Sequence, residues 1–223
     1  MKKKIAILHT SLVFVTKEKL LYNIMDELLP DVEITNIIDD KMLNIVMEKG
    51  SIDPEVKRRM CLYALAAESM GVDAIFSVCS SLGPATDVAR EIVSIPLIKI
   101  DEGMAEKAAK EGKRITVMAT VPTTIKPTVN LIKEYAGVFK TTPEFRESLS
   151  KGAFEHLMSG ATEKHDAMVM ETAKEAAKWS DMLVLAQASM TRLAPTLSDE
   201  VGLPVLSSPR LGVEKLARIL NDG

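Results

Sequence analysis

The sequence predicts an α/β fold of two pseudo-symmetric Rossmann-like lobes, each with a parallel β-sheet flanked by helices, and an active site in the cleft between them. Two observations lead to this prediction. Short apolar runs alternate with helical stretches along the chain, which is typical of βαβ units and parallel sheets. Three of the apolar runs then recur in the same order in the second half of the chain, which indicates an internal duplication.

In the first half of the chain, four short apolar runs have the length and composition of buried parallel strands. They cover residues 5–8, 32–38, 74–78 and 95–98. We expect helices over residues 16–29, 42–49, 54–70 and 85–93. The third helix has the clearest start, because Asp53 can cap it and Pro54 suits its first turn. Gly71 then ends it.

The second half of the chain repeats these strands. Ile115–Thr120 resembles Ile5–Thr10 at an offset of 110 residues, and Asp181–Gln187 matches Asp73–Cys79 at an offset of 108. A third pair, 203–206 against 95–98, has the same offset of 108. We expect helices over residues 126–136, 142–158, 163–179 and 213–220. The repeat therefore predicts a first lobe of residues 1–102 plus 208–223 and a second lobe of residues 103–207.

The composition excludes several classes of protein. The chain has 223 residues, a net charge of −3 with mixed signs, and no apolar run of membrane-spanning length, so neither nucleic acid nor membrane is expected as a partner. Its core is aliphatic, because 47% of residues are hydrophobic but only 4% are aromatic. The apolar run after Lys2–Lys4 ends at His9, too short for an export signal. We expect a soluble cytoplasmic protein, and homo-oligomerisation is left open.

The two cysteines are expected to differ in role. Two cysteines do not make a disulfide framework and indicate a reducing compartment. Cys61 lies among apolar residues of a predicted helix, so we expect an inert buried thiol. Cys79 ends an apolar strand before Gly83–Pro84 opens a helix, which is where open α/β sheets bind ligands. Helix amides there favour a thiolate, so we expect a pKa below the usual value of about 8.5; the alternative is a buried structural cysteine.

Polar residues also follow the other repeated strands. Gln187 occupies the position equivalent to Cys79. The hydroxyl and imidazole groups at these strand ends belong to His9, Ser80, Ser81, Thr120, Thr123, Thr124 and Ser189. Hydroxyls and helix-terminal amides suit a small carboxylate or an enolate without calling for a metal, although each hydroxyl taken singly is also explained as a cap or turn former. We expect His156 and His165 to face solvent.

The same residues resemble the aspartate/glutamate/hydantoin racemase superfamily. The resemblance covers nearly the whole chain. It rests on the two-copy layout and on Asp73-x-Ile-x-x-x-Cys79-Ser80-Ser81, Ile95-Pro96-Leu-Ile and Ala119-Thr120-x-x-Thr123-Thr124. Racemases of this family need neither metal nor pyridoxal phosphate and use two facing cysteines, one removing the α-proton and the other returning a proton on the opposite face. The resemblance implies that Cys79 is the first of these and that the strand-end hydroxyls bind a substrate carboxylate.

The sequence departs from the family where the second cysteine would lie, because that position is Gln187. Glutamine neither donates nor accepts a proton readily, although it can hydrogen-bond an oxyanion. His9 is a candidate replacement base, since it is expected at a strand end in the same cleft; the alternative is a hydrogen-bonded structural histidine.

Three functions stay open at this point. The first is a cofactor-independent isomerase that acts on an amino acid, hydantoin or related acid by proton transfer at the α-carbon through Cys79. The second is a single-cysteine decarboxylase or lyase of a malonate-like or hydroxy acid. The third is a non-catalytic small-carboxylate binding protein. Nucleotide enzymes are disfavoured because the glycine-rich phosphate-binding motifs are missing, and metal hydrolysis because no cluster has ligand spacing.

Overall fold

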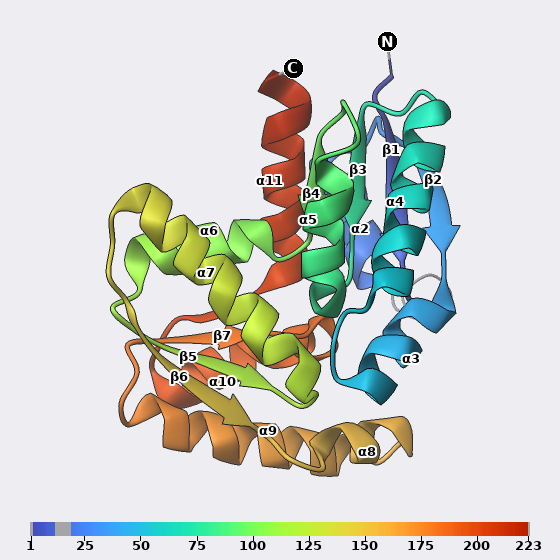
Figure 1. Ribbon diagram of the computed structural model, residues 1–223. Helices are drawn as coiled ribbons and strands as arrows, with labels where there is room; N and C mark the ends of the chain where they lie inside the picture. Colours follow the sequence, from blue (N-terminus) through green and yellow to red (C-terminus); the bar gives the residue numbers. More distant parts are fainter. Residues whose placement is uncertain (1, 12–18, 223) are drawn as a thin grey trace. The chain divides into compact units, whose positions relative to one another are not determined.

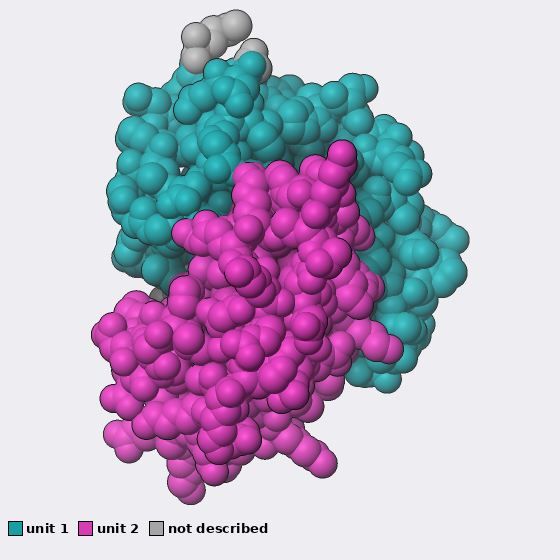
Figure 2. Space-filling view, turned by 90° about the vertical axis from the view of Figure 1, so that its left-hand side faces the viewer, with its two compact units in different colours: residues 1–102, 209–223 teal, residues 103–208 magenta. Residues whose placement is uncertain are grey.

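The computed structural model describes residues 2–11 and 19–222 (Figure 1). The chain divides into two compact units, coloured separately in Figure 2. Unit 1 comprises residues 1–102 and 209–223, and unit 2 comprises residues 103–208. Each unit contains a four-stranded parallel sheet flanked by helices. The predicted α/β fold with two parallel sheets is therefore confirmed.

Unit 1 is built on a sheet with the strand order β2-β1-β3-β4. Its strands are β1 (Lys4–His9), β2 (Glu33–Ile38), β3 (Ala74–Ser77) and β4 (Leu97–Lys99). Its helices are α2 (Leu20–Leu28), α3 (Asp40–Lys49), α4 (Pro54–Ser69), α5 (Gly83–Arg90) and α11 (Ser208–Asp222), with a 3-10 turn, η1 (Ser80–Leu82). Residues 16–18 of the first predicted helix lie outside the described residues.

The two faces of this sheet carry separate cores, because successive side chains of a strand point to opposite faces. Leu8, Ile75 and Leu97 pack on one face with residues of α3, α4 and α5. Ile7 and Phe76 pack on the other face with residues of α2 and α11. Strand residues two apart therefore share a helical layer, which decides where the side chains at the strand ends lie.

Helices α4 and α11 show how local sequence shapes unit 1. The Asp53 side chain accepts a hydrogen bond from the Val56 amide at 3.0 Å, and Pro54 lies in the first turn of α4, so the predicted helix start is confirmed. In α11, a Cβ at position 212 would overlap the backbone carbonyl of Ile100. Gly212 thus allows α11 to approach the end of β4 closely.

Unit 2 repeats the topology, with the strand order β6-β5-β7-β8. Its strands are β5 (Arg114–Ala119), β6 (Glu144–Leu149), β7 (Met182–Leu185) and β8 (Val205–Ser207). Its helices are α6 (Glu102–Glu111), α7 (Ile125–Phe139), α8 (Ala153–Met158), α9 (Thr162–Ala177) and α10 (Ala194–Val201). Two 3-10 segments, η2 (Pro122–Thr124) and η3 (Ala188–Leu193), follow β5 and β7. The sequence did not predict α6.

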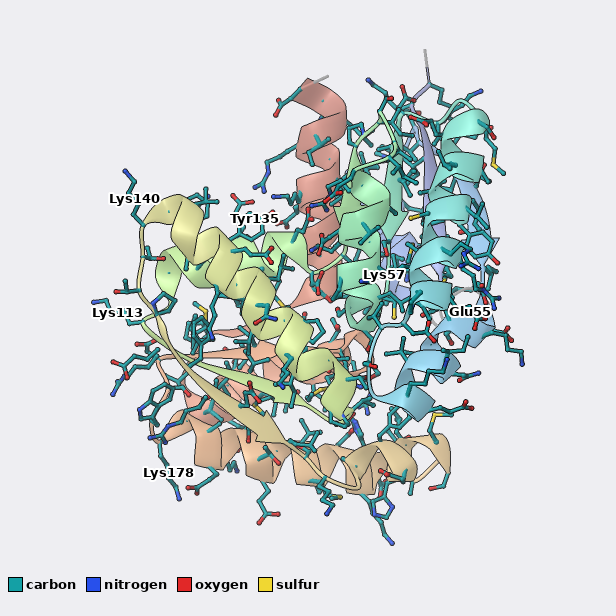
Figure 3. All side chains as sticks on the ribbon, in the orientation of Figure 1. Glu55, Lys57, Lys113, Tyr135, Lys140 and Lys178 are labelled. Atoms are coloured by element: carbon teal, nitrogen blue, oxygen red, sulfur yellow. The ribbon has the colours of Figure 1, made fainter. Side chains whose placement is uncertain are left out.

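The predicted helix over residues 142–158 is wrong in its first half. Lys140, labelled in Figure 3, ends α7 with a positive φ of 57°. The chain then forms β6, which pairs in parallel with β5 from Arg114↔Glu144 to Ala119↔Leu149. This edge strand is rich in charged residues, which favour a helix when read locally. Hydrogen bonding to β5 overrides that preference, and only α8 is helical.

Candidate functional site

In unit 1, three polar side chains follow the ends of β1, β3 and β4. They are Thr10, Cys79 and Asp101. Each of the three is an even number of residues from a strand residue of one core: Leu8, Ile75 and Leu97, respectively. Residues at even spacing along a strand share a face, so all three belong to the face covered by α3, α4 and α5. Cys79 itself packs against this core. The carboxyl ends of neighbouring parallel strands lie at one edge of a sheet, where α/β proteins bind ligands.

Cys79 is a half-buried free thiol. Burial raises the pKa of Cys79 above its usual value, while hydrogen bonds from the Thr10 side chain and from the backbone amides of Leu82 and Ser81 act in the opposite direction. The prediction of a lowered pKa is therefore wrong. It counted the amides at the turn but not the loss of solvation, which disfavours the thiolate. At neutral pH the resting group is a protonated thiol.

Ser80 and Ser81 lie in η1 directly after Cys79. The Ser80 side chain hydrogen-bonds the Asp101 carboxyl group, and the Ser81 amide points to the Cys79 sulfur. Asp101 is only 2% exposed. Burial raises the pKa of Asp101, although the charge of Lys99 and the Ser80 hydrogen bond oppose the shift. Local geometry thus brings Cys79, Ser80 and Ser81 together with Asp101.

Sequence reasoning missed Asp101 and preferred His9 to Thr10. The period-2 pattern could have found both residues, because Asp101 lies two residues after the end of β4 and Thr10 is in phase with Ala6 and Leu8. What the pattern does not reveal is that the Asp101 carboxyl group is almost fully buried.

His9 lies on the opposite face of the sheet from Cys79. It is in phase with Ile5 and Ile7, which pack with α2. Its Nε2 is 2.9 Å from Asn36 Oδ1, and the Tyr22 hydroxyl donates to the same oxygen at 2.8 Å. Burial lowers the pKa of His9, opposed by the Asn36 hydrogen bond. The structure does not bring His9 and Cys79 together.

In unit 2, the Gln187 side chain is held by the end of β5. Its Oε1 accepts hydrogen bonds from the Thr120 amide at 2.6 Å, the Thr120 hydroxyl at 3.2 Å and the Val121 amide at 2.9 Å. Backbone amides can only donate, so the atom that they contact must be the oxygen. The Gln187 NH2 group is therefore the end that does not contact the amides of Thr120 and Val121.

The other predicted residues of unit 2 lie in the turns after β5 and β7. The Thr124 hydroxyl donates to the Val121 carbonyl at 2.9 Å, as expected of a turn-forming threonine. Thr123 is half-buried beside it in η2, and Ser189 is half-buried in η3. Thr120, Thr123 and Thr124 thus follow one strand, and Gln187 and Ser189 follow its neighbour β7.

The expectation for His165 is wrong. It is fully buried on α9 in one row with Val169 and Ala173, and this i, i+4, i+8 spacing could have indicated a buried position. His165 Nδ1 lies 2.8 Å from Asp166 Oδ1. His156 is half-buried. Cys61 packs against the core on α4, as expected, but it is half-buried and not fully buried.

Metal-binding clusters and membrane-spanning helices are both absent from the described residues. Within residues 2–11 and 19–222, no group of three or more His, Cys, Asp or Glu side chains could hold a metal ion. In the same part of the chain, no helix is both long and apolar enough to cross a membrane.

Two sheets of one topology, each with polar residues at the ends of its inner strands, define a duplicated parallel α/β protein. Within that class, residues 45–216 match the sequence pattern described as Asp/Glu/Hydantoin racemase. The chain belongs to this family. No curated protein matches the sequence significantly.

Solved structures with the same fold include racemases and a decarboxylase. Glutamate racemase isoform RacE1 from Bacillus anthracis is 20% identical, with a TM-score of 0.69 over 100% of this chain and 83% of that one. Allantoin racemase from Klebsiella pneumoniae is 20% identical, with a TM-score of 0.67 over 99% and 89%. The Gly74Cys mutant of arylmalonate decarboxylase is 18% identical, with a TM-score of 0.62 over 99% and 94%. At these identities the likeness shows the fold, and membership of the Asp/Glu/Hydantoin racemase family supports an enzyme.

Proposed function

We propose that this protein is an enzyme that transfers a proton at the α-carbon of a small carboxylate, with Cys79 as its acid/base group and without metal or pyridoxal phosphate. The setting of Cys79 is the observation that carries the proposal. Its sulfur follows an inner strand of the sheet and receives hydrogen bonds from Thr10 and two backbone amides. These donors stabilise the thiolate that forms whenever the proton leaves. Membership of the racemase family supports the same chemistry.

The substrate classes that we propose are amino acids, hydantoins and related small acids. In this proposal the substrate-binding groups are hydroxyl side chains that follow the strand ends. They are Ser80 and Ser81 in unit 1 and Thr120, Thr123 and Ser189 in unit 2. Thr124 would act by shaping its turn, because its hydroxyl proton is used by Val121. His9 would support the end of β1 from behind, through Asn36.

As an isomerase, the enzyme would begin with the Cys79 thiolate. The sulfur takes the α-proton, and the electron pair of the C–H bond moves into the carboxylate to form an enediolate. A proton must then return to the α-carbon on the other face. Gln187 neither gives up nor takes a proton readily at neutral pH, so Cys79 and Gln187 do not form the two acid/base groups that inversion needs.

Decarboxylation of a malonate-like acid is the second candidate, and two observations favour it. Burial keeps Cys79 protonated at rest, which suits a proton donor better than a base. The anchored Gln187 amide offers N–H donors, which suit a carboxylate or an enediolate oxygen. The C–C bond would break and carbon dioxide would leave. The electron pair of that bond would stay on the remaining acid as an enediolate, and the thiol proton would then go to the α-carbon. Water would then reprotonate the thiolate.

One assay in deuterated water separates these reactions. Amino acids, hydantoins and substituted malonates are incubated with the protein, and deuterium uptake, inversion and carbon dioxide release are followed by NMR and chiral chromatography. We expect deuterium to enter at the α-carbon on one face. Cys79→Ala should abolish the reaction and Cys61→Ala should leave it intact. Binding without any reaction across the panel would favour the third alternative, a carboxylate-binding protein.

A further inference from the structure

Asp101 is a buried acid that the proposed reaction has not used. It follows β4, is 2% exposed and receives hydrogen bonds from the Ser80 side chain and its own backbone amide. Its other oxygen, Oδ1, is buried and has no hydrogen-bond partner among residues 2–11 and 19–222. Buried polar atoms in folded proteins are nearly always paired. An unpaired oxygen next to the Cys79–Ser80 turn therefore suggests that a ligand completes its bonding.

Among the described residues, the charged groups around Asp101 are paired with other partners, and none forms an ion pair with its carboxyl group. Lys99 lies two residues earlier on β4, but its Nζ bonds Asp87 on α5 at 2.6 Å. Glu102, at the start of α6, is bonded to Arg90 of α5. Cys79 is a further titratable neighbour, and a negative Asp101 disfavours its thiolate. Burying an ionised carboxylate without a paired cation is costly, so the neutral acid is favoured.

Asp39 is a matched contrast in the same unit. It is also buried, at 5% exposed. Burial alone would raise its pKa, but hydrogen bonds from Tyr63 Oη, the Lys41 amide and Arg59 outweigh burial and hold the pKa of Asp39 below its usual value. Asp39 is therefore an ionised buried aspartate. Asp101 has the burial without these donors.

We infer that Asp101 is held as a neutral carboxylic acid beside Cys79, and that the hydroxyl on its Oδ1 donates a hydrogen bond to an oxygen of the substrate carboxylate. The inference rests on the proposed function, which makes Cys79 the reacting group. Asp101 keeps its proton throughout. A neutral acid donor stabilises the negative charge that builds on the carboxylate oxygens as the enediolate forms. Through the repeat, Asp101 corresponds to Pro209, so this donor is contributed by unit 1 alone.

The protonation state can be measured without any substrate. In protein labelled with aspartate carrying 13C at the carboxyl carbon, Asp101 is assigned from Asp101→Asn and Asp39 from Asp39→Asn. We expect the Asp101 signal to keep the shift of a neutral acid at pH values where an ordinary aspartate, with a pKa of about 3.9, is already ionised. The Asp39 signal should already be that of a carboxylate. An Asp101 signal that is ionised at these pH values overturns the inference.

Contact with a carboxylate can be tested with two alkylating probes. Iodoacetate and iodoacetamide react with a thiolate in the same way, by forming an S–C bond and releasing iodide, but only iodoacetate carries a carboxylate. We expect the ratio of the iodoacetate rate to the iodoacetamide rate at Cys79 to fall roughly tenfold or more in Asp101→Ala, since a lost hydrogen bond to a charged group has that effect. Asp101→Asn retains an N–H donor and should preserve the ratio. Cys61 is the internal control, and its ratio should not change.

The pH dependence of the rate ratio is a second test that uses the wild-type protein and Asp101→Asn. A folding defect in Asp101→Ala therefore does not affect its result. As pH rises through the pKa of Asp101, the wild-type ratio should fall, because an ionised Asp101 repels the iodoacetate carboxylate. The ratio in Asp101→Asn should not show this fall. An unchanged ratio in Asp101→Ala, or the same pH profile in Asp101→Asn, contradicts the inference. If Cys79 reacts with neither probe, the proposed function fails, while the NMR titration still decides the state of Asp101.

Discussion

Thr120 donates two hydrogen bonds to Gln187, from its amide at 2.6 Å and from its hydroxyl at 3.2 Å. The same relationship exists in unit 1, where the Thr10 side chain hydrogen-bonds Cys79. The two pairs occupy equivalent places in the repeat, at the ends of the two inner strands of each sheet. In each unit a threonine hydroxyl therefore contacts the residue after the third strand of the repeat, and this residue is Cys79 in unit 1 and Gln187 in unit 2. A thiol there can give up and take back a proton, whereas a carboxamide does neither readily at neutral pH.

The stability of unit 2 should depend on the oxygen of Gln187. Gln187→Leu leaves the amides of Thr120 and Val121 without their acceptor, and each unsatisfied buried donor costs about 1–3 kcal/mol. We expect a clear fall in the urea midpoint for this variant. Gln187→Glu keeps an oxygen in place and should lose far less stability at neutral pH. Equal losses in the two variants would show that the three hydrogen bonds do not stabilise this turn.

Cys79 should react with iodoacetamide slowly at neutral pH. Its pKa is raised by burial, so the thiolate fraction, and with it the alkylation rate, should increase with pH to a midpoint above the usual value of about 8.5. Peptide mapping after quenching at each pH separates Cys79 from Cys61. A midpoint below about 8 would mean that the amides of Ser81 and Leu82 outweigh burial after all.

The carboxylate of Asp39 should make stability depend on pH. Its folded pKa is lowered, so its contribution is fully present above the unfolded pKa of about 3.9 and is lost as pH falls through the folded pKa. Asp39→Asn keeps an N-cap for α3 but loses the ion pair with Arg59. We expect about 1–3 kcal/mol of destabilisation at pH 7, measured by urea unfolding. The difference from wild type should shrink in acid, and a difference that stays constant to about pH 2 would exclude the Asp39 charge as its source.

The sequence predicted the repeated inner strands well because their apolar runs are continuous and buried on both faces. It failed at β6, whose charged residues resemble a helix when read alone. The repeat contained the missing signal, since β2 and β6 align from Glu33–Ile38 to Glu144–Leu149 at an offset of 111 residues. The candidate site was predicted only in part for a different reason. Side-chain identity does not show solvation, which decides the pKa of Cys79 and of Asp101.

The last prediction concerns the exchange of Gln187 for a cysteine. With an acid/base group on one face only, the native enzyme should give a single stereoisomer of its product. Gln187→Cys places a thiol beside the Thr120 hydroxyl, as Cys79 lies beside Thr10, and should create or raise racemisation of a substrate that the wild-type protein already converts. Chiral chromatography of the product over time measures it, with Gln187→Ser as a control that has a hydroxyl but no group able to take the proton at neutral pH. A cysteine misplaced by about 1 Å can lose roughly a hundredfold in rate, so a small gain over Gln187→Ser supports the idea. Rapid racemisation by the wild-type protein would refute it, because a second acid/base group would then already be present.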